Sequence, residues 1–254
     1  MALSLAHRLG MQRQITRQSF DPQSLFLNLF QNNRANEGPF LVGCHGRTRL
    51  SFVRNDLACD RSWSDDCRTT RENVCRPFAQ LLDKQSQNTT LVLNQGAHHL
   101  GLTLAREAQH TRLLAAWLVH NVTLERIVWL ISSPGHAGCE NATEPLDAPY
   151  TPPSDAGHGR VSYSWHTFVP RNARRAALLD VLLPGRVTYI DAASMSNRRA
   201  DAHMISPGFG PGAGSGHATR GMPIDCMHWC LPGPPDDWNT VLKAIVNLRG
   251  ACLN

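Results

Sequence analysis

The most informative stretch of this chain is residues 225–239, which read Asp-Cys-Met-His-Trp-Cys-Leu-Pro-Gly-Pro-Pro-Asp-Asp-Trp-Asn. Asp225 and His228 are three positions apart and can share one turn. A histidine in such a pair can take a proton from a nucleophile, while the carboxylate orients the ring and stabilises the imidazolium. Asp-x-x-His alone occurs by chance in many proteins, whereas the whole run is far more specific. The stretch therefore predicts His228 as a general base and Asp225 as its orienting carboxylate.

The chain has 254 residues, of which 42% are hydrophobic and 18% are charged, so it can bury a full core. Apolar runs typical of strands alternate with helical patterns, which favours a parallel sheet with helices on both faces. The strands are expected over 40–43, 90–93, 126–132 and 187–190, and the helices over about 50–58, 102–119, 171–183 and 238–248. Ligands of open α/β sheets bind at the carboxyl ends of strands, so the loops after the first three strands should converge.

Three further motifs precede the run at 225–239. Residues 93–98 read Leu-Asn-Gln-Gly-Ala-His, residues 133–136 read Ser-Pro-Gly-His, and residues 199–203 read Arg-Ala-Asp-Ala-His. In order and rough spacing across about residues 38–248, the four motifs resemble those of the plant trichome-birefringence-like proteins, the PC-esterase family of polysaccharide O-acetyltransferases.

The resemblance implies an SGNH-hydrolase-like three-layer α/β domain with a short parallel sheet and helices on both faces. We expect this domain over residues 38–254, after a polar N-terminal extension over residues 1–37 that is rich in Gln, Arg and Asn. The resemblance also implies acyl transfer through an acyl-enzyme intermediate, with Asp225 and His228 as catalytic residues.

The nucleophile motif departs from the family. Family members carry Gly-Asp-Ser after the first strand, with the Ser as nucleophile, whereas this chain has Gly43-Cys44-His45. His45 therefore occupies the nucleophile position. Cys44 is an alternative, because a thiolate close to His228 is a good nucleophile. The number of cysteines is even, however, so Cys44 can also be paired in a disulfide, or it can be a small buried residue.

Other candidate site residues have two interpretations each. Asn94 and the backbone of Gly43 can donate N–H groups to an oxyanion, or Asn94 can be a residue of the turn at the strand end. Arg199, Asp201 and His203 can bind a sugar hydroxyl, or the Arg–Asp pair can brace its loop.

Metal, cofactor and nucleic-acid binding are not expected. His98, His99, His136 and His203 should lie near one face, but their spacing matches no zinc signature. No tightly bound cofactor is implied either. The net charge of +5 is spread thinly without a run of five basic residues, so nucleic acid is not an expected partner.

Cysteines and glycosylation sequons indicate an oxidising compartment. The chain has eight cysteines, and sequons begin at Asn88, Asn121 and Asn141. Cys139 follows the third strand and Cys226 lies between the candidate catalytic residues, so both should occupy the same face and pair. Residues 59–77 should form a polar loop that is tied by a disulfide.

The compartment expected from the resemblance is the Golgi lumen or the secretory pathway. Family members are anchored there by an N-terminal helix, whereas residues 1–14 contain no apolar run of 7–15 residues. No segment of the chain reaches the ~18 apolar residues of a membrane span. A truncated gene model and an anchorless form both match this pattern.

Two functional hypotheses follow. The first is an O-acetyltransferase or acetylesterase that acts on a cell-wall-type polysaccharide, with this polysaccharide as acceptor and an acetyl donor as partners. The second is a catalytically inactive pseudoenzyme that binds glycan or assists an active relative, because the nucleophilic Ser is missing.

The motif at 43–45 generates a prediction about reactivity. Successive side chains at a strand end alternate in direction, so only one of positions 44 and 45 can face the cleft. The family places its nucleophile at position 45, so Cys44 should turn into the core. Cys44→Ala should leave any esterase activity unchanged, and iodoacetamide should not label Cys44 in the folded protein. Rapid labelling with parallel loss of turnover would instead make the protein a cysteine-dependent acyltransferase.

Overall fold

The computed structural model describes ten parts of the chain. They are residues 12–13, 40–43, 48–51, 55–68, 75, 90–95, 102–121, 126–153, 164–205 and 224–246. The chain divides into two compact units, of which one comprises residues 1–54 with 239–254 and the other comprises residues 55–238.

The first unit contains a small antiparallel sheet. Its strands are β1 (Gln12–Arg13), β2 (Phe40–Gly43) and β3 (Thr48–Ser51), in the order β1-β2-β3. The predicted strand at 40–43 is confirmed, but it pairs antiparallel with β3 instead of joining the parallel sheet.

The helix expected over about 50–58 is wrong. Residues up to Ser51 belong to β3, because the backbone groups of β2 are satisfied by pairing with that strand. Asn55 then begins a turn in which its side-chain amide donates to the Cys59 carbonyl at 2.6 Å. Its side-chain oxygen accepts from the Cys59 N–H at 3.3 Å, so the local hydrogen bonds favour a turn over a helix.

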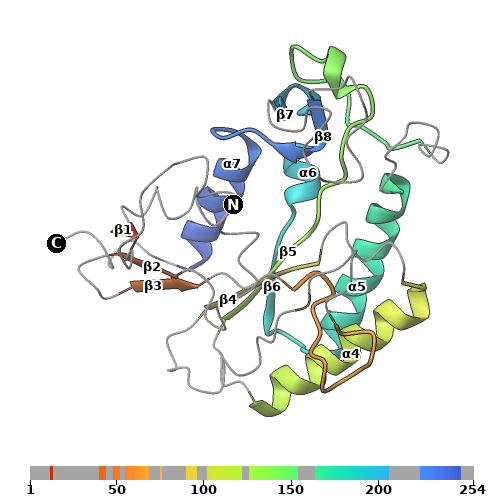
Figure 1. Cartoon of the computed structure of the whole chain (residues 1–254), viewed down its shortest axis with the longest axis vertical. Coiled ribbons are helices and arrows are strands. Elements are labelled where there is room, and N and C mark those ends of the chain that lie inside the picture. Colours follow the sequence, from red (N-terminus) through yellow and green to blue (C-terminus); the bar gives the residue numbers. More distant parts are fainter. Residues whose placement is uncertain are drawn as a thin grey trace. The chain divides into compact units, whose positions relative to one another are not determined.

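The second unit is built on a parallel sheet. Its strands are β4 (Thr90–Asn94), β5 (Arg126–Leu130) and β6 (Val187–Ile190), in the order β4-β5-β6. The connections run through α4 (Leu104–Asn121) and α5 (Phe168–Leu182). Figure 1 shows these two helices side by side along one side of the sheet. Both connections are expected on the same side, because crossovers are right-handed and each new strand is added in the same direction across the sheet.

Buried residues of the sheet and of the two helices form the core of this unit. Ile127 and Val128 of β5 are buried, as are Leu114 and Leu118 of α4 and Leu179 of α5. The four-residue spacing of the α4 pair places both side chains on one helix face. The expected α/β fold with a short parallel sheet and helices is confirmed.

A buried ionic cluster joins the two crossover helices. Glu107 of α4 accepts a hydrogen bond from Arg171 Nη1 at 2.5 Å and forms an ion pair with Arg175, both on α5. Burial lowers the pKa of Arg175 to about 10, so this guanidinium remains charged at neutral pH. Arg175 also lies over the Trp129 ring, 5.6 Å from its centroid.

Short elements follow β6 and were not predicted. They are α6 (Ala192–Ser196), a 3-10 turn (Ala200–Ala202), and the antiparallel pair β7 (His203–Ile205) and β8 (Ile224–Trp229). Two more 3-10 turns, Cys139–Asn141 and Trp165–Thr167, lie between β5 and α5.

The last helix begins earlier than expected, at Pro234, and is α7 (Pro234–Ile245). Proline suits the first helical position, and the Gly233 N–H donates to Asp236 Oδ2 at 2.9 Å. No helix in the described part of the chain is long and apolar enough to cross a membrane.

The ionic cluster generates a prediction for stability. Glu107→Ala leaves the Arg175 charge buried without its partner, so we expect a loss of about 3–5 kcal/mol in the free energy of unfolding. Arg106→Ala on the same helix is the matched control. It removes an ion pair with Asp66 and an exposed hydrogen bond to Gln109, and it should cost less than about 1 kcal/mol. Urea unfolding measures both, and equal losses would contradict the prediction.

Candidate functional site

The loops after β4 and β5 meet at the carboxyl end of the sheet, as expected. The Asn94 side-chain amide donates to the Leu130 carbonyl at 2.8 Å and to Ser132 Oγ at 2.9 Å. Ser132 Oγ in turn donates to the Gln95 carbonyl at 2.8 Å. Both N–H groups of Asn94 are therefore engaged within the protein, which favours the turn-residue interpretation over an oxyanion donor.

The segment after β5 is tied to β8. Cys139 and Cys226 form a disulfide with their Cα atoms 5.6 Å apart, which confirms the predicted pairing. One turn earlier, the His136 N–H donates to the Cys226 carbonyl at 3.1 Å. Gly135 lies at the closest point, where a Cβ would stand 2.3 Å from the Cys226 carbonyl oxygen and 2.4 Å from the Trp165 ring.

The expected turn at 225–228 is wrong, because these residues lie in β8. Met204 of β7 pairs with Asp225, whereas His203 pairs with Trp229, so residues 226–228 have no partner position on β7. Such an irregularity re-aims side chains in a strand. The irregular part of β8 includes His228, whose side chain is exposed to solvent.

Several candidate site residues or their side chains lie outside the part of the chain that the structure describes. The Asp225 side chain, Cys44 and His45 are among them, as are His98 and His99. Gly43 belongs to the unit made of residues 1–54 and 239–254, whereas His228 belongs to the other. The Asp225–His228 pair and its nucleophile remain predictions.

Two buried histidines form a chain of contacts behind His228. His136 Nδ1 lies 2.8 Å from His203 Nε2, and His203 Nδ1 lies 3.0 Å from the His228 carbonyl oxygen. At the other end, His136 Nε2 lies 3.1 Å from the Asn197 carbonyl oxygen. Burial lowers the pKa of His136, against smaller raising effects of the Asn197 carbonyl and the Asp201 carboxylate.

Aromatic rings enclose these two imidazoles. Trp229 stacks on His203 with 4.1 Å between ring centroids, and the Tyr150 ring centroid lies 4.7 Å from that of His136. Trp238 packs edge-on against Trp229 and donates from Nε1 to Ser196 Oγ at 2.9 Å. Both tryptophans contribute to packing.

Arg199 and Asp201 pair with each other. The guanidinium donates to the two carboxylate oxygens at 2.9 and 3.1 Å, and this bond raises the pKa of Arg199. The pairing favours the bracing interpretation, and sugar binding by Arg199 and Asp201 remains a prediction. His203 is buried behind Trp229, which disfavours direct sugar contact by its ring.

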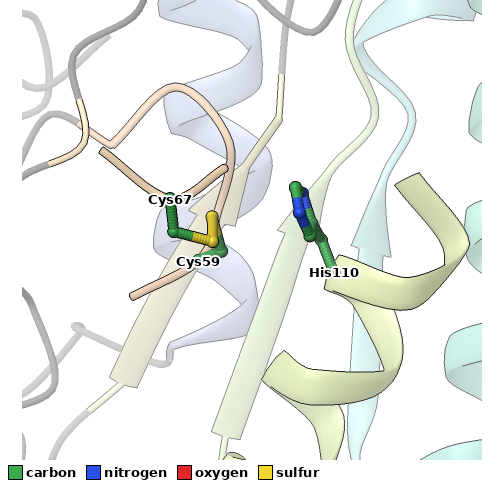
Figure 2. A group of neighbouring side chains, drawn as sticks. All are labelled: Cys59, Cys67 and His110. Atoms are coloured by element: carbon green, nitrogen blue, oxygen red, sulfur yellow. A yellow bond between two sulfur atoms is a disulfide. The ribbon is translucent and has the colours of Figure 1, made fainter. Parts of the chain in front are cut away.

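Two groups of described side chains bring potential metal ligands within 4.8 Å of one another. One is Cys59, Cys67 and His110, and the other is Cys139, Glu140 and Cys226. Figure 2 shows the first, in which the His110 ring extends from α4 on the side of the Cys59–Cys67 disulfide. The ligand form of cysteine is the thiolate, and in both groups the sulfurs are joined in a disulfide.

The disulfide between Cys59 and Cys67 also confirms the predicted tied loop. His110 lies 3.6 Å through Nε2 from Asp66 Oδ2, and burial lowers the pKa of this histidine.

The sequence did not indicate how the motifs contact one another. The sequence places His136 only in a set of histidines for which metal binding is not expected, offers sugar binding as one interpretation of His203, and assigns no role to Tyr150 or Asn197. The Ser-Pro-Gly-His and Arg-Ala-Asp-Ala-His motifs each end in histidine, which was the available signal for a His–His contact.

The parallel sheet, its crossover helices and the motif-bearing loops at its carboxyl end form an α/β domain. Residues 82–245 match the PC-Esterase family, described as a GDSL/SGNH-like acyl-esterase family found in Pmr5 and Cas1p. The chain belongs to this family.

The chain matches individual relatives over part of its length. The chain is 34% identical to xylan O-acetyltransferase 2 of Oryza sativa subsp. japonica over 148 residues, which are 53% of this chain and 28% of that protein. It is 31% identical to protein trichome birefringence-like 36 of Arabidopsis thaliana over 137 residues, which are 52% of this chain and 33% of that protein. It is 38% identical to xyloglucan O-acetyltransferase 1 of Populus trichocarpa over 61 residues, 24% and 14% of the two chains. The matched region thus spans about a third or less of each relative.

Close packing at Gly135 generates a prediction. Gly135→Ala forces a methyl group against the Cys226 carbonyl and the Trp165 ring, so we expect a loss of about 1–3 kcal/mol or more in the free energy of unfolding. Gly138→Ala is the control, because its Cβ meets nothing within 4 Å and only its positive φ opposes the change. Chemical unfolding should show the larger loss for Gly135→Ala, and the reverse order would count against this packing.

Proposed function

We propose that the chain transfers an acetyl group to, or removes one from, a hydroxyl of a cell-wall-type polysaccharide. The observation that carries the proposal is the placement of His228. Its ring is exposed, while the backbone around it is fixed by the Cys139–Cys226 disulfide and by the contact of the His228 carbonyl with His203. An exposed ring on a fixed backbone is what a general base needs.

In this proposal His228 acts as the general base and Asp225 orients its ring. As the nucleophile attacks the ester carbonyl, His228 takes its proton, and the same proton then goes to the leaving alkoxide. The acyl-enzyme is next attacked by a polysaccharide hydroxyl, or by water in the esterase reaction. His228 takes the proton of the attacking hydroxyl and returns it to the nucleophile.

Polysaccharide as the acceptor is supported by family membership and by the names of the relatives. Xylan and xyloglucan O-acetyltransferases are acetyltransferases of plant polysaccharides by their names. The two disulfides among the described residues support a secretory compartment, where such bonds form and persist.

The nucleophile of this reaction is proposed at position 45, with Cys44 as the alternative. Histidine at the Ser position also favours a second function, that of a pseudoenzyme which binds glycan or assists an active relative. The two functions make opposite predictions for one substitution.

The test is hydrolysis of a small acetyl ester by wild type, His228→Ala and His45→Ser. If the chain is an enzyme, wild type is active and His228→Ala lowers kcat by about 10²–10⁴-fold, because the general base is lost. His120→Ala, at an exposed histidine near the end of α4, is the matched control and should leave kcat unchanged.

An inert wild type with an active His45→Ser variant would establish the pseudoenzyme instead. Equal activity of wild type and His45→Ser would place the nucleophile elsewhere. An active wild type that tolerates His228→Ala would remove the general base from the proposal.

A further inference from the structure

The two buried histidines have fewer protons than their contacts require. The chain of contacts runs from the Asn197 carbonyl through His136 and His203 to the His228 carbonyl, at 3.1, 2.8 and 3.0 Å. Both ends are carbonyl oxygens, which only accept hydrogen bonds. Three contacts at these distances therefore need three N–H protons, whereas two neutral imidazoles carry two.

The neutral pair consequently makes only two of the three hydrogen bonds. The central contact is the shortest, at 2.8 Å, and needs a proton between the rings. If both rings carry their proton on Nδ1, His203 donates to the His228 carbonyl and His136 Nε2 faces Asn197 without a proton. If both carry it on Nε2, the Asn197 contact is a hydrogen bond and the His228 contact is not.

We propose that His203, which contacts His136, is a positioning residue for His228. The hydrogen bond from His203 to the His228 carbonyl then depends on which ring nitrogens of the pair carry protons. This inference rests on the proposed function in so far as His228 is the general base. His203 donates to the His228 carbonyl when its Nδ1 is protonated. The pair makes all three hydrogen bonds only when it binds a third proton.

The surroundings of the pair act in both directions. The Asp201 carboxylate, paired with Arg199, favours the third proton, as does the Asn197 carbonyl, whereas burial opposes it. Stacking of Trp229 on His203 is compatible with a cationic ring. Among the described residues, titratable groups near the pair include the Tyr150 hydroxyl, which accepts from the Ala137 N–H, and the Cys230 thiol, which donates to the His203 carbonyl.

The direction with pH follows. Burial lowers the pKa of His136, so the third proton is bound only at pH values below those at which an exposed histidine titrates, about 6.5. Below that range, all three hydrogen bonds form. Above it, the pair alternates between a state in which His203 donates to the His228 carbonyl and a state in which His136 donates to the Asn197 carbonyl.

A matched pair of variants separates the two nitrogen positions of His203. The amide nitrogen of Asn is as many bonds from Cα as Nδ1, and that of Gln as many as Nε2. His203→Asn therefore keeps a donor for the His228 carbonyl, whereas His203→Gln keeps only a partner for His136. Circular dichroism and the thermal midpoint establish that both variants fold.

The first readout is backbone hydrogen exchange of residues 224–230 in the full chain, which needs no activity. We expect exchange to accelerate at least about tenfold in His203→Gln and less than about threefold in His203→Asn. If the two variants behave alike, or if His203→Asn is the more affected, the positioning role is wrong. This readout remains informative if the proposed enzymatic function fails.

The second readout is activity on the small acetyl ester. Because small misplacement of a catalytic group can cost up to about 100-fold, we expect kcat to fall about 10- to 100-fold in His203→Gln, with a much smaller fall in His203→Asn. A change confined to KM in His203→Gln would contradict positioning of the general base.

The third readout is the protonation state of the rings, from imidazole ¹⁵N NMR as a function of pH. We expect the pair to hold three ring protons at acidic pH, so that one ring carries two N–H groups and the other carries one, with loss of one proton from the pair as a unit below about pH 6.5. Two rings that titrate independently at ordinary histidine pH values would overturn the shared-proton arrangement.

Discussion

The site depends on the link between the segment after β5 and strand β8. The Cys139–Cys226 disulfide joins residues separated by 87 positions in the sequence, and the hydrogen bond from the His136 N–H to the Cys226 carbonyl reinforces this link. On a chain-entropy model, a cross-link closing a loop of this length stabilises the fold by about 4–5 kcal/mol. The irregular part of β8, with the exposed His228, is held to the carboxyl end of the sheet by this link.

Buried polar groups impose the second constraint, because Ser132 and residues 134–136 at the start of the loop after β5 are buried. Its buried groups find partners on other elements: the Asn172 amide donates to the Ser132 carbonyl at 2.8 Å, and the His136 N–H donates to the Cys226 carbonyl at 3.1 Å. Loss of one partner would leave a buried group unsatisfied, at a cost of about 1–3 kcal/mol. The histidine pair belongs to this network and differs from it in needing one proton more than two neutral rings hold.

Two ion pairs formed by arginines lie in different parts of the fold. Arg175 is buried with Glu107 between α4 and α5, and this pair fixes how the helices pack on the sheet. Arg199 pairs with Asp201 close to the histidine pair, with its side chain 37% exposed. The first pair acts on the core, while the second pair holds the turn that leads into His203 and adds the Asp201 charge to the field around His136.

The sequence by itself determined the family, the strands predicted over 90–93, 126–132 and 187–190 to within two residues at their ends, and the Cys139–Cys226 pairing. Hydrophobic runs, helical spacing and motif order are local properties, so they can be read without coordinates. The tertiary structure alone decided that residues 40–43 pair antiparallel and that Asp225 and His228 lie on an irregular strand. It also decided that His136 contacts His203. These features depend on which distant backbone and ring atoms supply the missing hydrogen-bond partners, and local sequence patterns do not specify those partners.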